Sequence, residues 1–286
     1  MNPYETFVSE FSRIVRQGKA HPLGGFPMPK TPKPARDAPR ALIFSPHPDD
    51  EVIIGALPLR LLRELGWNVI NVAITQGSNK ARQTERWKEL QACCEFIGFG
   101  LVASVENGLE GINTKARSED PRVWGKSVEC IMRVLSEQKP HAIFFPHDDD
   151  WNVTHIGTHH LVMDAMRGLR TGFSCYAVET EFWGAMDTPN LLVESSERDV
   201  IDLITALSFH VGEVKRNPYH VRMPAWLMDN VRRGSELVGG QGGAAPDFLF
   251  GTLYRLRRWE DGTFQPVLKK GRFVSQSDDL RALFTP

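Results

Sequence analysis

Short apolar runs alternate with longer amphipathic segments through most of this chain, and this alternation constrains the fold more than any other feature. The runs are rich in β-branched and aromatic residues, which is typical of strands buried on both faces. We expect strands at residues 41–44, 68–75, 141–146 and 174–183. We expect helices at residues 52–66, 82–96, 124–138 and 158–169. The pattern predicts an α/β fold, a mostly parallel sheet with helices on both of its faces.

The two ends of the chain depart from this alternation. Residues 4–17 carry apolar side chains at helical spacing and predict a short amphipathic helix, and the Pro- and Gly-rich segment 22–40 predicts an extended linker. We therefore divide the chain into an N-terminal arm, residues 1–40, and a single domain, residues 41–286. Such an arm could wrap its own domain or a neighbouring subunit, so a homo-oligomer is a further expectation.

The later part of the domain gives weaker signals. Pro58 predicts a kink or a late start in the helix at 52–66. Residues 200–215 indicate a helix, 239–246 a flexible loop and 248–259 a closing strand.

Composition excludes several classes of protein. The formal net charge of the 286 residues is −1, so no basic field is present to attract nucleic acid or an anionic membrane. No apolar run approaches the ~20 residues of a membrane span, and the first residues do not form a signal peptide. The four cysteines include an adjacent pair and no CxxC motif, which favours reduced thiols and a cytoplasmic location.

Two loops carry most of the polar chemistry. Residues 47–51 read His-Pro-Asp-Asp-Glu and follow the first predicted strand, whereas residues 147–155 read His-Asp-Asp-Asp-Trp-Asn-Val-Thr-His and follow the third. Functional sites of parallel sheets form at the carboxyl ends of strands, so both loops should lie at one edge. Histidine and carboxylate ligands without thiolate suit a divalent metal, most often Zn²⁺.

The spacing of these residues suggests which of them bind the metal and which acts as the base. His47 and Asp50 lie three apart across a turn that proline stiffens, so both can reach one ion, and His155 is well placed as a third ligand. Two histidines, one aspartate and an open position for water would make a hydrolytic site. Asp49 would then lie close to the water as a general base. His159 or His160 remains an alternative third ligand.

Each loop also has a simpler interpretation. The acids of residues 47–51 could complement a helix N-terminus, and residues 147–155 could form a solvated acidic loop with Thr154 as a helix cap. Two His/Asp loops at equivalent strand ends favour the metal site over these alternatives.

The strand followed by HPDDE, the later histidine loop and the RxxEL segment at residues 86–90 together resemble the PIG-L/LmbE-like family of zinc-dependent de-N-acetylases. The resemblance covers roughly residues 41–215. It implies a Rossmann-like fold with the metal held by His47, Asp50 and His155, and with Asp49 as the base. It also implies that Arg86 and His210 lie near the substrate, although each could instead be an ordinary helix residue.

One position departs from the family. Where the family has HPDH, this chain has Asn152, Val153, Thr154 and His155. Asn152 can donate a hydrogen bond to an oxyanion but cannot carry a proton. The leading expectation is a zinc-dependent hydrolase, with another divalent metal as an alternative, that removes an N-acetyl group from a small amino-sugar substrate or glycoconjugate. A metal-dependent hydratase or lyase of an unsaturated carboxylic acid is the second hypothesis, and a non-catalytic binding protein the third.

Overall fold

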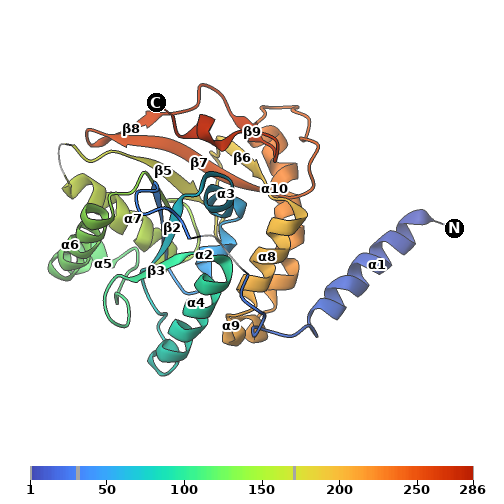
Figure 1. Cartoon of the computed structure of the whole chain (residues 1–286), viewed down its shortest axis with the longest axis horizontal. Coiled ribbons are helices and arrows are strands. Elements are labelled where there is room, and N and C mark those ends of the chain that lie inside the picture. The colour runs from blue at the N-terminus through green and yellow to red at the C-terminus, as the bar shows by residue number, and fades with distance from the viewer. Residues whose placement is uncertain (1, 30–32, 170–171, 286) are drawn as a thin grey trace.

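A nine-stranded sheet runs through the domain, with helices on both of its faces (Figure 1). The structure, a computed structural model, describes residues 2–29, 33–169 and 172–285. The strands lie in the order β3-β2-β1-β4-β5-β7-β6-β9, and β8 pairs with β7. They span Arg40–Ser45 (β1), Asn68–Ala73 (β2), Gly100–Ala103 (β3), Ala142–Pro146 (β4), Cys175–Thr180 (β5), Leu191–Glu194 (β6), Gly251–Glu260 (β7), Thr263–Pro266 (β8) and Arg272–Val274 (β9).

The helices cover the two faces of the sheet. They span Pro3–Gly18 (α1), Asp50–Ile53 (α2), Ala56–Leu65 (α3), Gln83–Ile97 (α4), Ala116–Glu119 (α5), Pro121–Gln138 (α6), Val153–Gly168 (α7), Glu197–Leu207 (α8), Val211–Arg216 (α9) and Met223–Leu237 (α10), with 3₁₀ turns at Lys80–Arg82 (η1), Tyr219–Arg222 (η2) and Leu280–Leu283 (η3). Helices α6 and α7 lie on one side of the sheet, and α4 and α8 lie on the other (Figure 1).

Each face of the sheet has its own apolar core. Leu61 of α3, Leu90 of α4 and Leu203 of α8 belong to the cluster on one face. Leu135 of α6 and Val162 of α7 belong to the cluster on the other. The expected α/β architecture is therefore confirmed, because strands β3, β2, β1, β4 and β5 pair in parallel and are covered on both faces.

Helix boundaries differ from the predictions at three points. The helix expected at 158–169 begins at Val153, because Asn152 caps it by accepting a hydrogen bond from the Thr154 N–H at 2.9 Å. The segment 52–66 is broken at Gly55, which has φ +81° and where a Cβ would lie 2.0 Å from Thr252 Oγ1. Pro58 falls in the first turn of α3, where its missing N–H is harmless.

The third difference concerns the segment 200–215, which is two helices, α8 and α9, separated at residues 208–210. Tertiary contacts end α8, since His210 turns inward to bond with Glu51. The predicted closing strand is β7, which runs antiparallel to β5 and carries the sheet on to β6 and β9. The short strands β3, β6, β8 and β9 had no sequence prediction.

Two general expectations can also be compared with the structure. All four cysteines are free and buried. Among the described residues, no helix is both long enough and apolar enough to cross a membrane. The division between arm and domain stays a prediction.

Candidate metal centre

The two polar loops meet at one edge of the sheet. Strands β1 and β4 are parallel neighbours, with Ile43 opposite Phe144, so the loops that follow them leave the sheet side by side. The first loop carries His47 and leads into α2, which begins at Asp50. The second leads into α7, whose first turn carries His155. Sequence neighbours on each loop thereby become spatial neighbours across the edge.

His47, Asp50 and His155 form a compact triangle of ligand atoms. The distance from His47 Nδ1 to Asp50 Oδ2 is 3.3 Å, from Asp50 Oδ2 to His155 Nε2 3.3 Å, and from His47 Nδ1 to His155 Nε2 3.3 Å. Ligands at ~2.0–2.1 Å from a tetrahedral ion lie about 3.3–3.4 Å apart. The three atoms therefore have the spacing that a tetrahedral divalent cation requires.

The electrostatics of the triangle also favour a cation. Asp50 is fully buried, and its Oδ1 has no hydrogen-bond partner among the described residues. Burial opposes ionisation, but His155 and His47 hold the pKa of Asp50 far below its ordinary value. Burial likewise opposes charge on His155, yet Asp50 and Asp150 raise its pKa to about 10. A buried carboxylate of this kind needs a positive partner, which a metal ion would supply.

Asp150 fixes the orientation of His155. Its Oδ2 lies 3.2 Å from His155 Nδ1 and accepts the N–H groups of Trp183 and Gly184, each at 3.1 Å. Its Oδ1 accepts the Asn152 N–H at 2.8 Å. Because the Nδ1 hydrogen bonds to this carboxylate, Nε2 is left as the metal-facing nitrogen of the ring. The sequence predicts no role for Asp150.

Asp49 lies beside the triangle in a strained conformation. Its φ is +114°, which is unfavourable for a residue with a Cβ and is typical of functional sites. Its carboxylate accepts a hydrogen bond from the hydroxyl of Tyr219, and its N–H donates to Glu51 Oε2 at 2.9 Å. Burial, followed by the charge of Asp50, raises the pKa of Asp49 to about 7. Asp49 and Tyr219 both line a cavity.

His210 does not lie where the sequence placed it. Its side chain has no exposed surface, and its Nε2 lies 2.6 Å from Glu51 Oε1. A side chain with no exposed surface does not contact a substrate in this conformation. His210 instead braces Glu51, which in turn holds the backbone of Asp49. Glu51 and His210 also form a second close cluster with Cys93, and all three are buried.

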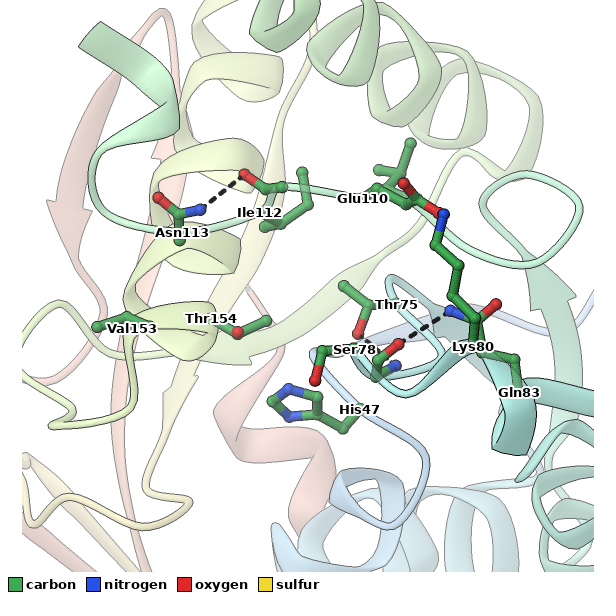
Figure 2. A pocket seen from close by; sticks show the side chains of 13 residues that line it. His47, Thr75, Ser78, Lys80, Gln83, Glu110, Ile112, Asn113, Val153 and Thr154 are labelled. Carbon is green, nitrogen blue, oxygen red and sulfur yellow. Dashed lines mark hydrogen bonds and ion pairs between the residues drawn. The ribbon is translucent and has the colours of Figure 1, made fainter. Parts of the chain in front are cut away.

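Two cavities reach the metal triangle at His47, the member of the triangle that lines them both. One, of about 400 Å³, extends from His47 past Ser78 to Ile112 and Asn113. Figure 2 shows His47 at one end of this cavity and Glu110, Ile112 and Asn113 at the other. The second, of about 390 Å³, also reaches His47 and Ser78. Its other lining residues include Asp49, Arg86, Trp151, Asn152, Trp183, Glu213, Arg216 and Tyr219.

Arg86 lies in the second cavity, held by the backbone around it. Its Nη2 donates to the Pro48 carbonyl at 2.8 Å and lies 3.9 Å from Asp49 Oδ1. Gly77 makes room for it, because a Cβ there would lie 2.2 Å from Arg86 Nη1. Arg86 therefore adds positive charge beside the buried carboxylate.

His147 and His159 bond to the backbone rather than to the metal triangle. Both ring nitrogens of His147 are bonded, Nε2 to the Gly184 carbonyl at 3.0 Å and Nδ1 to the Asp149 N–H at 3.2 Å. His159 Nδ1 bonds the Pro146 carbonyl at 2.9 Å. Neither they nor His160 belong to the ligand cluster found among the described residues.

With the geometry established, the chain can be compared with known families. Residues 42–166 match the family model of PIG-L, the GlcNAc-PI de-N-acetylase. Over this segment the chain is similar to the PIG-L family. The matched segment contains every residue of the metal triangle, together with Asp49, Arg86 and Asn152. The match agrees with the resemblance read from the HPDDE motif, and it supports the expectation of an N-deacetylase among the hydrolases.

Several solved structures share the fold of this chain at low sequence identity. An N,N′-diacetylchitobiose deacetylase from Pyrococcus horikoshii is 15% identical with a TM-score of 0.57, covering 92% of this chain and 94% of that one. A 4-carboxy-2-hydroxymuconate hydratase from Pseudomonas putida is 16% identical with a TM-score of 0.56, covering 81% and 99%. A zinc-inhibited teicoplanin deacetylase is 16% identical with a TM-score of 0.52, covering 78% and 99%. No curated protein matches the sequence. These likenesses establish the fold.

Proposed function

We propose that this chain is a metal-dependent hydrolase that removes the N-acetyl group from an amino sugar or a related glycoconjugate. The observation that carries the proposal is the triangle of His47, Asp50 and His155, whose ligand atoms lie 3.3 Å apart. Its member His47 lines two cavities. The amino-sugar substrate is suggested by the matched family and by the chitobiose deacetylase of similar fold.

The proposed cofactor is a divalent metal ion, with Zn²⁺ as the first candidate because two histidines and one carboxylate suit it. When bound, the ion would act as a Lewis acid toward the amide carbonyl and the attacking water. The zinc-inhibited deacetylase of similar fold makes it prudent to test other divalent ions as well.

Asp49 is the proposed general base. Its carboxylate is buried and lines the cavity, so little bulk water competes for it. The Tyr219 hydroxyl and the Glu51 carboxylate hold the side chain and the backbone of Asp49 in place. Asp49 would take a proton from the water as the water oxygen bonds to the carbonyl carbon.

Asn152 is the proposed donor to the oxygen that gains negative charge. Its Oδ1 already accepts the Thr154 N–H, so the NH₂ group is the part of the amide that remains to donate. Asn152 lines the same cavity as Asp49. A neutral donor of this type can stabilise an oxyanion but cannot protonate the leaving group.

The proton for the leaving amine is then best supplied by Asp49, which holds the one taken from water. Three nearby histidines are less suited: His147 has both ring nitrogens bonded, His159 Nδ1 bonds the Pro146 carbonyl, and His210 is fully buried. Transfer from Asp49 to the nitrogen as the C–N bond breaks would release acetate and the free amine. Tyr219 keeps its own proton, since burial and the charge of Asp49 raise its pKa well above the ordinary value.

Two cavities that both reach His47 suit a substrate with groups on both sides of the amide. Trp151, Trp183 and Arg216 line one cavity, and Ile112 and Asn113 line the other. A cytoplasmic location remains a proposal, and the four free cysteines are compatible with it.

Activity is tested with protein loaded with Zn²⁺, Co²⁺ or Mn²⁺ and offered N-acetylglucosamine, diacetylchitobiose and N-acetylglucosaminyl lipids. Acetate and free amine should appear in equal amounts. Asp49→Asn should abolish turnover, while its control Asp149→Asn, an exposed acid of the second loop, should not. His155→Ala should lose the metal and His160→Ala should keep it. A metal-loaded protein that releases no acetate from any of these substrates would refute the proposal.

The second candidate is hydration of an unsaturated carboxylic acid. Asn152 in place of the family histidine and the hydratase of similar fold favour it. Loss of the ultraviolet absorbance of an unsaturated diacid, with no acetate released from acetamides, would replace the first proposal by this one.

A further inference from the structure

Trp151 is an exposed aromatic residue beside the metal centre. Tryptophan side chains are generally well buried, yet Trp151 has 69% of its surface exposed. It lines the second cavity together with Asp49, the proposed base, and Asn152, the proposed donor. A group that contacts this indole ring is therefore held in the same cavity as the residues that would act on the amide.

The indole ring is fixed at its polar edge. The Nε1–H of Trp151 donates to the Trp183 carbonyl at 2.9 Å, and the two rings lie 6.4 Å apart at an angle of 51°. Trp183 is itself packed, with its ring 6.0 Å from that of Trp226 and 5.2 Å from that of Tyr219. Because its edge is bonded while most of its surface is exposed, Trp151 offers an apolar face that is already oriented.

The charged groups of the second cavity are already paired. Arg216 Nη2 lies 2.5 Å from Glu213 Oε2, and Arg86 Nη2 lies 3.9 Å from Asp49 Oδ1. Neither of these arginines therefore offers an unpaired charge to a phosphate or a free carboxylate. Paired donors and acceptors, together with the amide of Asn217, suit hydroxyl groups, which both donate and accept hydrogen bonds.

An apolar face beside paired polar groups matches the chemistry of a pyranose ring. In a β-linked ring of glucosamine configuration the hydroxyls are equatorial, so the axial C–H groups on carbons 1, 3 and 5 form an apolar face. Such a face packs on an aromatic ring, while the equatorial hydroxyls reach the polar groups around it.

We propose that Trp151 is the platform on which the sugar ring of the substrate stacks, so that the second cavity holds the amine side of the amide. This inference rests on the proposed function and deepens it, because it assigns the sugar ring to one of the two cavities. The first cavity then remains for the acyl side.

The first experiment measures kcat and KM of the metal-loaded protein for N-acetylglucosamine, diacetylchitobiose and 2-acetamidoethanol, which has the amide but no ring. Trp151→Ala should lower kcat/KM for the two sugars at least ~10-fold, mainly through KM, because the stacked face is lost. Turnover of 2-acetamidoethanol and the metal content should stay at their wild-type values. Trp151→Phe, which keeps a smaller aromatic face, should recover most of the loss.

The matched control lies in the first cavity. Val153 is also exposed, at 54%, but it lines the first cavity (Figure 2). Val153→Ala should leave kcat/KM for both sugars at its wild-type value. A larger loss in Val153→Ala than in Trp151→Ala would place the sugar ring in the first cavity and would overturn the proposal.

The second experiment measures binding without turnover, by saturation-transfer NMR of the Asp49→Asn protein with the methyl β-glycoside of N-acetylglucosamine. The axial protons on carbons 1, 3 and 5 should receive more saturation than the other ring protons. Adding Trp151→Ala should remove this difference. The result does not depend on acetate release, so the sugar platform and the proposed reaction can fail separately.

Three further results would overturn the proposal. The first is unchanged kcat/KM and unchanged sugar binding in Trp151→Ala. The second is an equal loss for the sugars and for 2-acetamidoethanol, which would mean that Trp151 only supports the structure of its loop. The third is an unsaturated diacid that binds through Trp151 while no sugar binds, which would give the cavity to a planar acid.

Discussion

Substitution of Asp150 offers the sharpest test of the metal centre, because Asp150 contacts the proposed metal ligand His155 but does not itself bind the metal. Asp150→Asn keeps the size of the side chain but removes its charge and one acceptor oxygen. His155 would lose the carboxylate at 3.2 Å that fixes its ring, and an NH₂ group would face either the Asn152 N–H or the N–H groups of Trp183 and Gly184.

The expected magnitude follows from these contacts. Loss of the carboxylate behind a metal-bound histidine costs about 10- to 100-fold in metal affinity, which is about 1.4–2.8 kcal/mol. Asp150→Ala should cost folding stability in addition. It leaves the buried N–H of Gly184 and its neighbours without an acceptor, at ~1–3 kcal/mol for each such group. The asparagine variant should therefore separate the effect on metal binding from the effect on folding.

The assay is a competition for Zn²⁺ against a chromophoric chelator, run on wild type, Asp150→Asn and the control Asp149→Asn, with thermal melting of the apo-proteins alongside. The exposed Asp149 side chain should give wild-type affinity. Wild-type affinity in Asp150→Asn would refute the role assigned to this carboxylate. A loss matched by Asp149→Asn would point instead to the general negative charge of the loop.

Four further outcomes are expected. Asp49→Asn should lower kcat by about 10²- to 10⁴-fold, measured as acetate release, while atomic absorption finds unchanged metal content. Chelation should lower the melting temperature, and metal at ~100 times its Kd should restore about 2.7 kcal/mol; a melting curve indifferent to metal would contradict the site. Gly157→Ala should destabilise by about 1–3 kcal/mol in denaturant titration, because its Cβ would lie 2.6 Å from Asn113 N, whereas Gly125→Ala, with nothing within 4 Å, should not. Arg255 lowers the pKa of Asp148, although burial acts in the opposite direction. Because the Asp148 side chain is largely exposed, the pair should contribute less than about 1 kcal/mol to folding stability, and this contribution is fully present at pH values above the unfolded pKa near 3.9. The stability difference between wild type and Asp148→Asn should then vanish as pH falls through the folded pKa.

Local signals in the sequence were sufficient for four of the five neighbouring parallel strands, all but β3. Apolar runs long enough to be buried on both faces predicted β1, β2, β4 and β5, because a strand covered by helices on both sides has no solvent-facing alternation. The short strands at the far edge gave no such signal. β6 and β9 are four and three residues long, and β6 pairs with β7 and β9, which both come from distant parts of the chain.

The candidate site divides in the same way. Residue types and spacing within two loops suggested His47, Asp50 and His155, since ligand chemistry is a property of the residues themselves. The roles of Asp150 and Tyr219 could not be read from spacing. Tyr219 lies 170 positions from Asp49, and Asp150 looks like one acid among three until its partners are known.

His210 is the converse case. The family resemblance predicted that His210 lies near the substrate, but the fold turns the His210 side chain inward to Glu51. The sequence by itself determined the buried strands β1, β2, β4 and β5 and the side chains that could bind a metal, because both depend on local periodicity and on residue chemistry. Only the tertiary structure decided which acid orients the ligand, which hydroxyl holds the base and which histidine is hidden, because these depend on distances between segments far apart in the chain.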